Sequence, residues 1–279
     1  MANAPKPTTV KKESSSSAGS MFSSFAIPIC IVVSILVFWL FLGDSSHYKG
    51  GDVDHGDPTD IFGLVHKGGY VVPIIMSCLL MVITFSIERF VVIGKASGSG
   101  SIDSFVKKVQ AFLNAGNIDA ASAECDKQKG SVANVIKSGL KKYREMELEP
   151  NLDVDQKTLA IQKDIEEATS LEMPMLEQNL TIIATLVSIG TLMGLLGTVL
   201  GMIGAFRTMS AAGAPNASEL SGHISEALIN TALGISTSAI SIVMYNIFTS
   251  KIDNLTYAID ETGFSIVQTF AASHKSTKH

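Results

Sequence analysis

The sequence predicts an all-α membrane protein with four transmembrane helices and a helical cytoplasmic portion. Of its 279 residues, 46% are hydrophobic and only 17% are charged, and the mean hydropathy is positive. Four apolar stretches are each long enough to cross the bilayer, which takes about 20 helical residues. Between the second and third stretches, apolar residues recur at helical spacing among many charged ones. This combination is typical of an integral membrane protein with a polar portion.

Charge and cysteine content exclude several classes of function. The net charge is −5, and no basic patch with interleaved aromatic residues is present, so we expect no nucleic-acid partner. Cys30, Cys78 and Cys125 are isolated thiols without paired spacing, which indicates neither a disulfide framework nor a zinc site. We expect no metal and no cofactor.

The first 67 residues divide into three segments. Residues 1–20 are rich in Pro, Lys and Ser and are expected to form a disordered cytoplasmic tail. Residues 21–43 are predicted to be an N-terminal transmembrane helix. A cleaved signal peptide is the alternative, but the apolar run is long and residues 43–47 are no small-x-small cleavage site. Residues 44–67 are rich in Asp and Gly and are interpreted as a solvated periplasmic loop. Its Asp52-x-Asp54 pattern lacks the glycine placement and closing glutamate of a calcium loop.

The second predicted span covers residues 70–93 and ends in a charged pair, Glu88 and Arg89. We interpret the pair as interfacial anchors that reach the lipid headgroups, with partner docking as the alternative. Residues 95–177 form the helical cytoplasmic portion, with helices expected at 102–113, 118–128, 131–146 and from 155 onward. We find no phosphate loop, nucleophile elbow or metal motif there, so we expect no enzymatic activity.

The third and fourth predicted spans, residues 180–206 and 223–250, contain an unusual number of glycines and polar residues for membrane helices. Small residues at four-residue spacing let helix backbones approach closely, which predicts that the two spans pack through glycines. The packing glycines are Gly190, Gly194, Gly197, Gly201 and Gly234. The fourth span is polar for a membrane helix and therefore needs protein or water partners. Residues 251–279 are expected to form an amphipathic cytoplasmic helix and a tail.

Lys and Arg cluster near the N-terminus, after the second span and after the fourth. Because such residues favour the cytoplasmic side, both termini and the helical portion are expected there. With this topology Thr198 and Thr231 each lie about eight residues from the outer end, roughly 12 Å deep. Two level hydroxyls can line a hydrated path, and Glu226, nearer the outside, can tune cation access or contact a partner. The alternative is that the hydroxyls only bond helix to helix or to their own carbonyls.

Proton relays place Asp, Glu or His at membrane depth, but the only carboxylates in these spans are Glu88 and Glu226, near opposite ends. If the chain conducts protons, the central carrier must come from another chain.

Several motifs together resemble the MotA/TolQ/ExbB proton-channel family, closest to its ExbB and TolQ branch. They are Gly194-Leu195-Leu196-Gly197-Thr198-Val199-Leu200-Gly201-Met202, Ile224-Ser225-Glu226-Ala227-Leu228-Ile229-Asn230-Thr231-Ala232-Leu233-Gly234, Tyr245-Asn246, Ser86-Ile87-Glu88-Arg89 and Met175-Leu176-Glu177-Gln178-Asn179-Leu180. The similarity covers about residues 68–250, which would be the proton-channel domain.

The resemblance implies a ring, usually a pentamer, in the inner membrane of a Gram-negative bacterium. The ring would surround transmembrane helices of an ExbD- or TolR-type partner whose aspartate carries the proton. Thr198 and Thr231 match the family's pore-facing threonines, and Glu226 its glutamate. The assembly would drive a TonB- or TolA-type transducer acting on the outer membrane.

Two features depart from the family pattern. Thr191 and Ile240 stand where prolines are common, which puts gating details in doubt, and the span within residues 21–43 is additional. Two other functions stay open. A structural scaffold would only pack its helices together, and a small-solute transporter would show inverted repeats, which we do not find. ExbB-like, TolQ-like and flagellar-stator-like roles are not separated by this chain.

Overall fold

The structure is a computed structural model that describes residues 15–53, 56–211 and 217–275. Its helices are α1 Ser15–Leu36, α2 Ile61–His66, α3 Val72–Ser97, α4 Ile102–Asn114, α5 Ile118–Gln128, α6 Gly130–Leu148, α7 Val154–Glu177, α8 Leu180–Ala211 and α9 Ala217–Lys275, with short 3₁₀ or π turns at Val37–Leu42, Ser45–His47, Lys49–Gly51 and Gly69–Val71. The described residues form no β-strand. Four helical stretches are long and apolar enough to cross a membrane, within Phe22–Leu42, Gly69–Asn114, Val154–Ser210 and Ala217–His274. The predicted fold class is confirmed.

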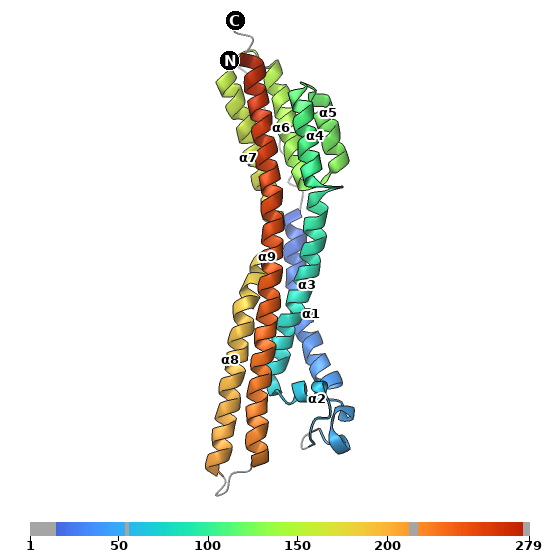
Figure 1. Cartoon of the computed structure of the whole chain (residues 1–279), viewed down its shortest axis with the longest axis vertical. Helices are drawn as coiled ribbons and strands as arrows, with labels where there is room; N and C mark the ends of the chain where they lie inside the picture. The colour runs from blue at the N-terminus through green and yellow to red at the C-terminus, as the bar shows by residue number, and fades with distance from the viewer. Residues whose placement is uncertain (1–14, 54–55, 212–216, 276–279) are drawn as a thin grey trace, which may run out of the picture.

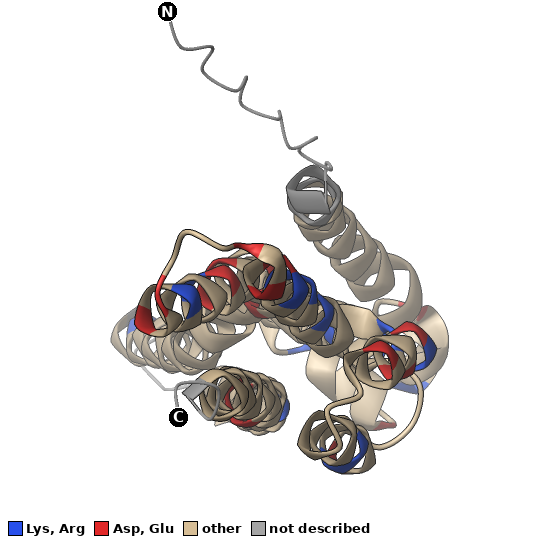
Figure 2. Cartoon of the chain, turned by 90° about the horizontal axis from the view of Figure 1, so that it is seen from above, with Lys and Arg blue, Asp and Glu red and all other residues tan. Residues whose placement is uncertain are grey.

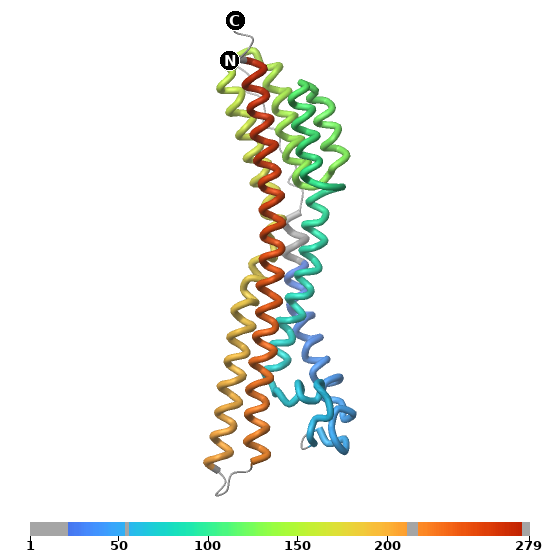
Figure 3. Tube along the Cα trace, viewed as in Figure 1, coloured from blue at the N-terminus to red at the C-terminus, as the bar shows by residue number. Residues whose placement is uncertain are grey.

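Helix α9 is the long axis of the molecule (Figure 1). Its 59 residues form one continuous helix, about 90 Å long at 1.5 Å per residue. Helix α8 runs antiparallel beside the first half of α9, and α4 to α7 gather beside the second half, as the tube view also shows (Figure 3). The fourth span and the tail helix expected after Lys251 are therefore parts of one helix.

The end of the molecule built from α4 to α7 has its own apolar core. Val109, Ile136, Ile161 and Ile266 come from α4, α6, α7 and α9, and each side chain is fully buried. Acidic and basic residues lie along the helices of this end, which is nearest the viewer in Figure 2. The helical bundle expected for residues 95–177 is thus an amphipathic one, closed on one side by α9.

The N-terminal helix α1 begins at Ser15, inside the segment expected to be a disordered tail; residues 1–14 of that tail lie outside the described part of the chain. The helix packs on α3. The Ser34 hydroxyl donates a hydrogen bond to the Pro73 carbonyl at 2.5 Å, and the rings of Phe22 and Phe85 meet edge to face. The extra span is consequently held against the second span along its length.

Residues 43–68 form a cap on the ends of α1 and α3. More than half of its described residues are exposed, and a few local contacts order it. Tyr48 is 4% exposed, and its hydroxyl lies 2.6 Å from His66 Nδ1. Asp60 caps α2 by accepting from the Gly63 N–H, and its second oxygen lies 2.6 Å from His47 Nδ1. The Gly63 N–H, followed by His47, holds the pKa of the Asp60 carboxyl below its ordinary value. The contact between Tyr48 and His66 and the capping of α2 by Asp60 hold the described part of the cap together. Asp54 and His55 lie outside the described residues.

The charged pair at the end of the second span does not reach toward lipid headgroups. Arg89 is 1% exposed, and its Nη1 donates to the carbonyls of Met175 and Leu176 at 3.2 and 3.1 Å. Glu88 pairs with the same guanidinium and accepts from Asn179 Nδ2 at 3.4 Å. The last carbonyls of a helix have no partner within it. Arg89 supplies one at the break between α7 and α8, so the interpretation of Arg89 as an interfacial anchor was wrong.

Candidate functional site

The candidate site is the line of contact between α8 and α9, which we call the seam. Its glycines leave no room for side chains. A β-carbon on Gly234 would lie 2.6 Å from the Gly190 carbonyl oxygen, and one on Gly201 would lie 2.8 Å from Ala227 Cβ. At Gly194 the nearest atom, the Asn230 carbonyl oxygen, would be 3.2 Å away. Close backbone approach requires this spacing of small residues.

Two threonine hydroxyls face each other across the seam, at one level as predicted. Thr198 Oγ1 and Thr231 Oγ1 lie 2.5 Å apart, and both reach the Gly194 carbonyl, at 3.1 and 3.3 Å. Thr231 also lies 3.2 Å from the Ala227 carbonyl. Because each hydroxyl donates once and accepts twice, the pair satisfies its donors internally and keeps lone pairs for water. Both side chains are partly exposed. Their role in a pore stays a prediction.

A second hydroxyl contact lies further along the seam, toward the α7 end. Thr191 Oγ1 and Ser238 Oγ are 2.8 Å apart, and Ser238 donates to the Val187 carbonyl at 2.7 Å. Thr191 is one of the two positions where the family pattern commonly has proline. Its hydroxyl forms a contact between the helices that sequence reasoning did not foresee.

Glu226 lies on a different side of α9 from Thr231. Its Oε2 is 3.4 Å from His223 Nδ1, and a β-carbon on Gly69 would lie 2.5 Å from its Oε1. Residues four apart share a helix face. Glu226 therefore shares its face with Asn230 and lies beside the beginning of α3, while Thr231 shares its face with Ala227 and α8. Cation access through Glu226 stays a prediction.

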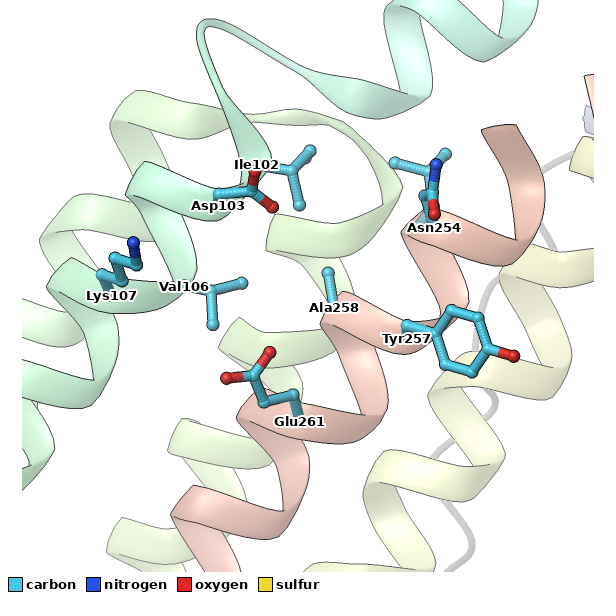
Figure 4. Close-up of a pocket in the computed structure, with 9 residues that line it drawn as sticks. Ile102, Asp103, Val106, Lys107, Asn254, Tyr257, Ala258 and Glu261 are labelled. Carbon is cyan, nitrogen blue, oxygen red and sulfur yellow. The ribbon is translucent and has the colours of Figure 1, made fainter. Parts of the chain in front are cut away.

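One pocket of the described residues, of about 330 Å³, opens between α8 and α9 at the α7 end of the seam, where Leu180 and Tyr245 line it. A pocket of about 530 Å³ separates α4 from α9 in the bundle, where Asp103 and Lys107 of α4 face Glu261 of α9 (Figure 4). Tyr257 is 70% exposed at its rim. Among the described residues no group of three or more His, Cys, Asp and Glu side chains gathers as metal ligands do. The seam is thus tightly packed at its glycines and opens into a pocket only toward the α7 end.

Comparison with known proteins agrees with this geometry. The MotA/TolQ/ExbB proton channel family matches residues 127–261, from the end of α5 into α9, and this segment contains the whole seam. The predicted resemblance to this family is confirmed. The chain is thus similar to this family over residues 127–261, and four of its helical stretches are long and apolar enough to cross a membrane.

Two relatives of the MotA/TolQ/ExbB kind are similar to this chain. The Tol-Pal system protein TolQ of Pseudomonas aeruginosa is 24% identical over 208 residues, which cover 73% of this chain and 87% of that protein. The biopolymer transport protein ExbB-like 3 of Synechocystis sp. is 39% identical over 88 residues, 31% of this chain and 42% of that protein. The first likeness extends over most of the chain, and the second is confined to a shorter segment.

Proposed function

We propose that the chain is a ring-forming subunit, in a pentamer, of an inner-membrane motor driven by protons. The observation that carries this proposal is the Thr198–Thr231 pair, held at one level on a glycine-packed seam inside the segment that matches the family. Hydroxyl groups relay hydrogen bonds because they donate and accept. The motor would pass the energy of proton flow to a TonB- or TolA-type transducer.

The pair needs a titratable group that this chain does not supply. Glu88 is tied to Arg89 at one end of its span, and Glu226 lies beside Gly69 at the other. A proton crossing the membrane needs an acid near its middle. We therefore propose that a single-span protein of ExbD or TolR type brings an aspartate to the ring. Protons are the coupling ion, and the chain needs no cofactor and catalyses no reaction of its own.

The exposed surface of the seam helices supports an assembly. On α8, large apolar side chains are exposed over several turns, as Leu192, Leu195, Val199 and Ile203 illustrate. Such a surface needs lipid, another copy of the chain or a partner helix to cover it. In the proposed ring, copies of the chain and the guest helices cover part of it and lipids cover the rest. Both termini and the bundle of α4 to α7 would be cytoplasmic.

Reconstitution with the partner tests this proposal. The chain would be purified with a single-span, Asp-bearing protein of ExbD or TolR type. Native mass spectrometry would give the ring size, and proton uptake would be recorded in liposomes under a membrane potential. We expect a pentameric ring that conducts with the partner and not without it. Conduction that survives replacement of the partner's aspartate by asparagine would contradict the role assigned to that residue.

A structural scaffold is the second candidate, because the two hydroxyls already satisfy their donors inside the hairpin. A scaffold would bind its partners equally well after the proton gradient is dissipated. In cells that lack the chain, complementation that resists a protonophore would favour it. In cells that lack the chain, loss of outer-membrane import would indicate an ExbB-like role. Loss of envelope integrity in those cells would indicate a TolQ-like role.

A further inference from the structure

Asn230 is a fully buried polar side chain at the seam. It lies in α9 one residue before Thr231 and is 0% exposed. Its Nδ2 donates to the Gly68 carbonyl at 2.8 Å, across 162 residues of sequence. On its other side, a β-carbon on Gly197 would lie 2.3 Å from Asn230 Cβ. One side chain of α9 thus contacts both α8 and the backbone just before α3.

The Gly68 carbonyl closes the cap formed by residues 43–68. Nearby, Phe38 and Leu42 at the end of the extra span pack with Val72 of α3 and Leu233 of α9. These apolar contacts hold the cap near α9 but have no preferred height along it. The hydrogen bond from Asn230 is directional, so it sets that height.

Packing stability gives no reason for an asparagine at this position. Within the described residues, Asn230 Oδ1 is buried and has no hydrogen-bond partner. A buried acceptor without a partner is unfavourable, and an apolar side chain of similar size would avoid it. The advantage of asparagine at position 230 must lie in its hydrogen bond to the Gly68 carbonyl and in the position at which that bond holds α9.

We propose that Asn230 is a positioning residue. Its bond to the Gly68 carbonyl sets the height of α9 against α8 and keeps the Thr231 hydroxyl level with that of Thr198. A glycine seam offers few interlocking side chains that resist sliding, so its register depends on directional bonds. The hydroxyl contacts join α8 and α9 directly, and the Asn230 bond ties α9 to the backbone before the Gly69–Val71 turn, which also contacts α8. The consequence for proton flow rests on the proposed function, whereas the geometric claim does not.

Disulfide trapping tests the geometry without any partner. In a background with Cys30, Cys78 and Cys125 replaced by Ala, Thr198→Cys and Thr231→Cys would place two sulfurs where hydroxyls now lie 2.5 Å apart. The oxidation rate in membranes reports the register. Asn230→Ala is expected to slow disulfide formation several-fold.

Ser34→Ala is the matched control. Ser34 is also 0% exposed and also donates to a backbone carbonyl near the start of α3, that of Pro73, but it belongs to α1. Its loss is expected to leave the oxidation rate unchanged. Equal rates in the Asn230→Ala variant and its parent would overturn the proposal, and so would equal slowing in both alanine variants.

Asn230→Asp supplies a second, pH-dependent readout. A protonated aspartic acid can donate to the Gly68 carbonyl, whereas the carboxylate can only accept and is repelled by it. Relative to the asparagine parent at the same pH, disulfide formation in this variant should recover as the pH falls. For Asn230→Ala, the rate of disulfide formation relative to the asparagine parent should not change with pH. Parallel pH profiles would contradict the donor role.

Proton flux through the complex with the single-span partner distinguishes the positioning role of Asn230 from the consequence of that role for proton flow. We expect Asn230→Ala to lower flux and disulfide formation together. Slow disulfide formation with normal flux would support the positioning role and count against the pore role of Thr231. Normal disulfide formation overturns the positioning role whatever the flux.

Discussion

Arg89 shows how one buried side chain fixes two membrane helices. Its guanidinium is 1% exposed and joins α3 to the last carbonyls of α7, at the break where α8 begins. Asn179 adopts a positive φ of 63° in that break. The sequence placed the Glu88–Arg89 pair at the correct end of the span. It did not show that the pair points inward, because the carbonyls that it serves lie 86 and 87 residues away.

Arg89→Leu should lower the stability of the chain in detergent by about 3–5 kcal/mol, because it leaves the Glu88 carboxylate and the α7 carbonyls without their donor. Lys95→Leu is the control, since that cation is exposed near the end of the same helix. Thermal unfolding followed by circular dichroism measures both. Equal melting temperatures in the two variants would contradict the account of Arg89.

The sequence predicted the placement of the two threonine hydroxyls but not the contact made by Asn230. Counting residues from the span ends placed Thr198 and Thr231 at one level. The count works because a helix rises by a fixed distance per residue and the two spans run antiparallel. Asn230 was visible only as one polar residue among many. Its partner is a backbone carbonyl, which no side-chain pattern reveals.

At the scale of elements, the seam depends on backbone contact rather than on side-chain interlocking. Gly234 lies against Gly190 and Gly194 so closely that a β-carbon would be 2.6 and 2.7 Å from their atoms. The G-x-x-x-G steps predicted this close approach, because small residues at that spacing have few other uses in a membrane helix. They did not identify which glycines meet.

Gly234→Ala should therefore push α8 from α9 and cost about 1–3 kcal/mol of stability. Gly94→Ala is the matched control in α3, because a β-carbon there meets nothing within 4 Å. Alanine is the better helix former, so the control should be neutral or slightly stabilising. Thermal unfolding in detergent distinguishes them, and a stable Gly234→Ala variant would refute close packing at the seam.

In the bundle, Glu124 of α5 links two elements. It accepts from Lys108 of α4 at 2.8 Å and from Lys127 at 3.3 Å, and these lysines hold the pKa of its carboxyl below the ordinary value of 4.5. When folding lowers the pKa of a carboxyl, that group stabilises the protein at pH values above its pKa in the unfolded chain. This stability is lost as the pH falls through its pKa in the folded protein.

Glu124→Gln should consequently melt at a lower temperature than the parent at pH 7, and the difference should shrink between about pH 5 and pH 3. Glu145→Gln provides the comparison, since Glu145 pairs only with Lys142 of its own helix and is half exposed. Surface pairs of that kind contribute about 0–1 kcal/mol. A Glu124 effect that grows as the pH falls would have the wrong sign.

At the scale of the whole molecule, α9 unites the seam with the bundle. The sequence predicted a span up to about residue 250 and an amphipathic tail helix after Lys251, without showing whether the two are continuous. Composition sets what surrounds a helix, whereas Pro and Gly determine where a helix stops. No proline occurs in α9, and the helix runs on without a break.

The cap on residues 43–68 marks the limit of sequence reasoning at this scale. Its Asp and Gly content indicated solvent, yet Tyr48 and His66 are held by a bond of 2.6 Å and pack with Phe38. These contacts depend on where α1 ends relative to α3. Only the assembled structure supplies that relation.

Proton flux through the complex with its single-span partner, measured for Thr231→Val, tests the central claim most directly. Thr237→Val is the control, because that hydroxyl lies in the same helix and donates to the Leu233 carbonyl of α9 itself. With equal assembly, Thr231→Val should conduct about tenfold less than the control, the equivalent of about 1.4 kcal/mol in the barrier. Equal flux in the two variants would contradict the assignment of the seam to the proton path.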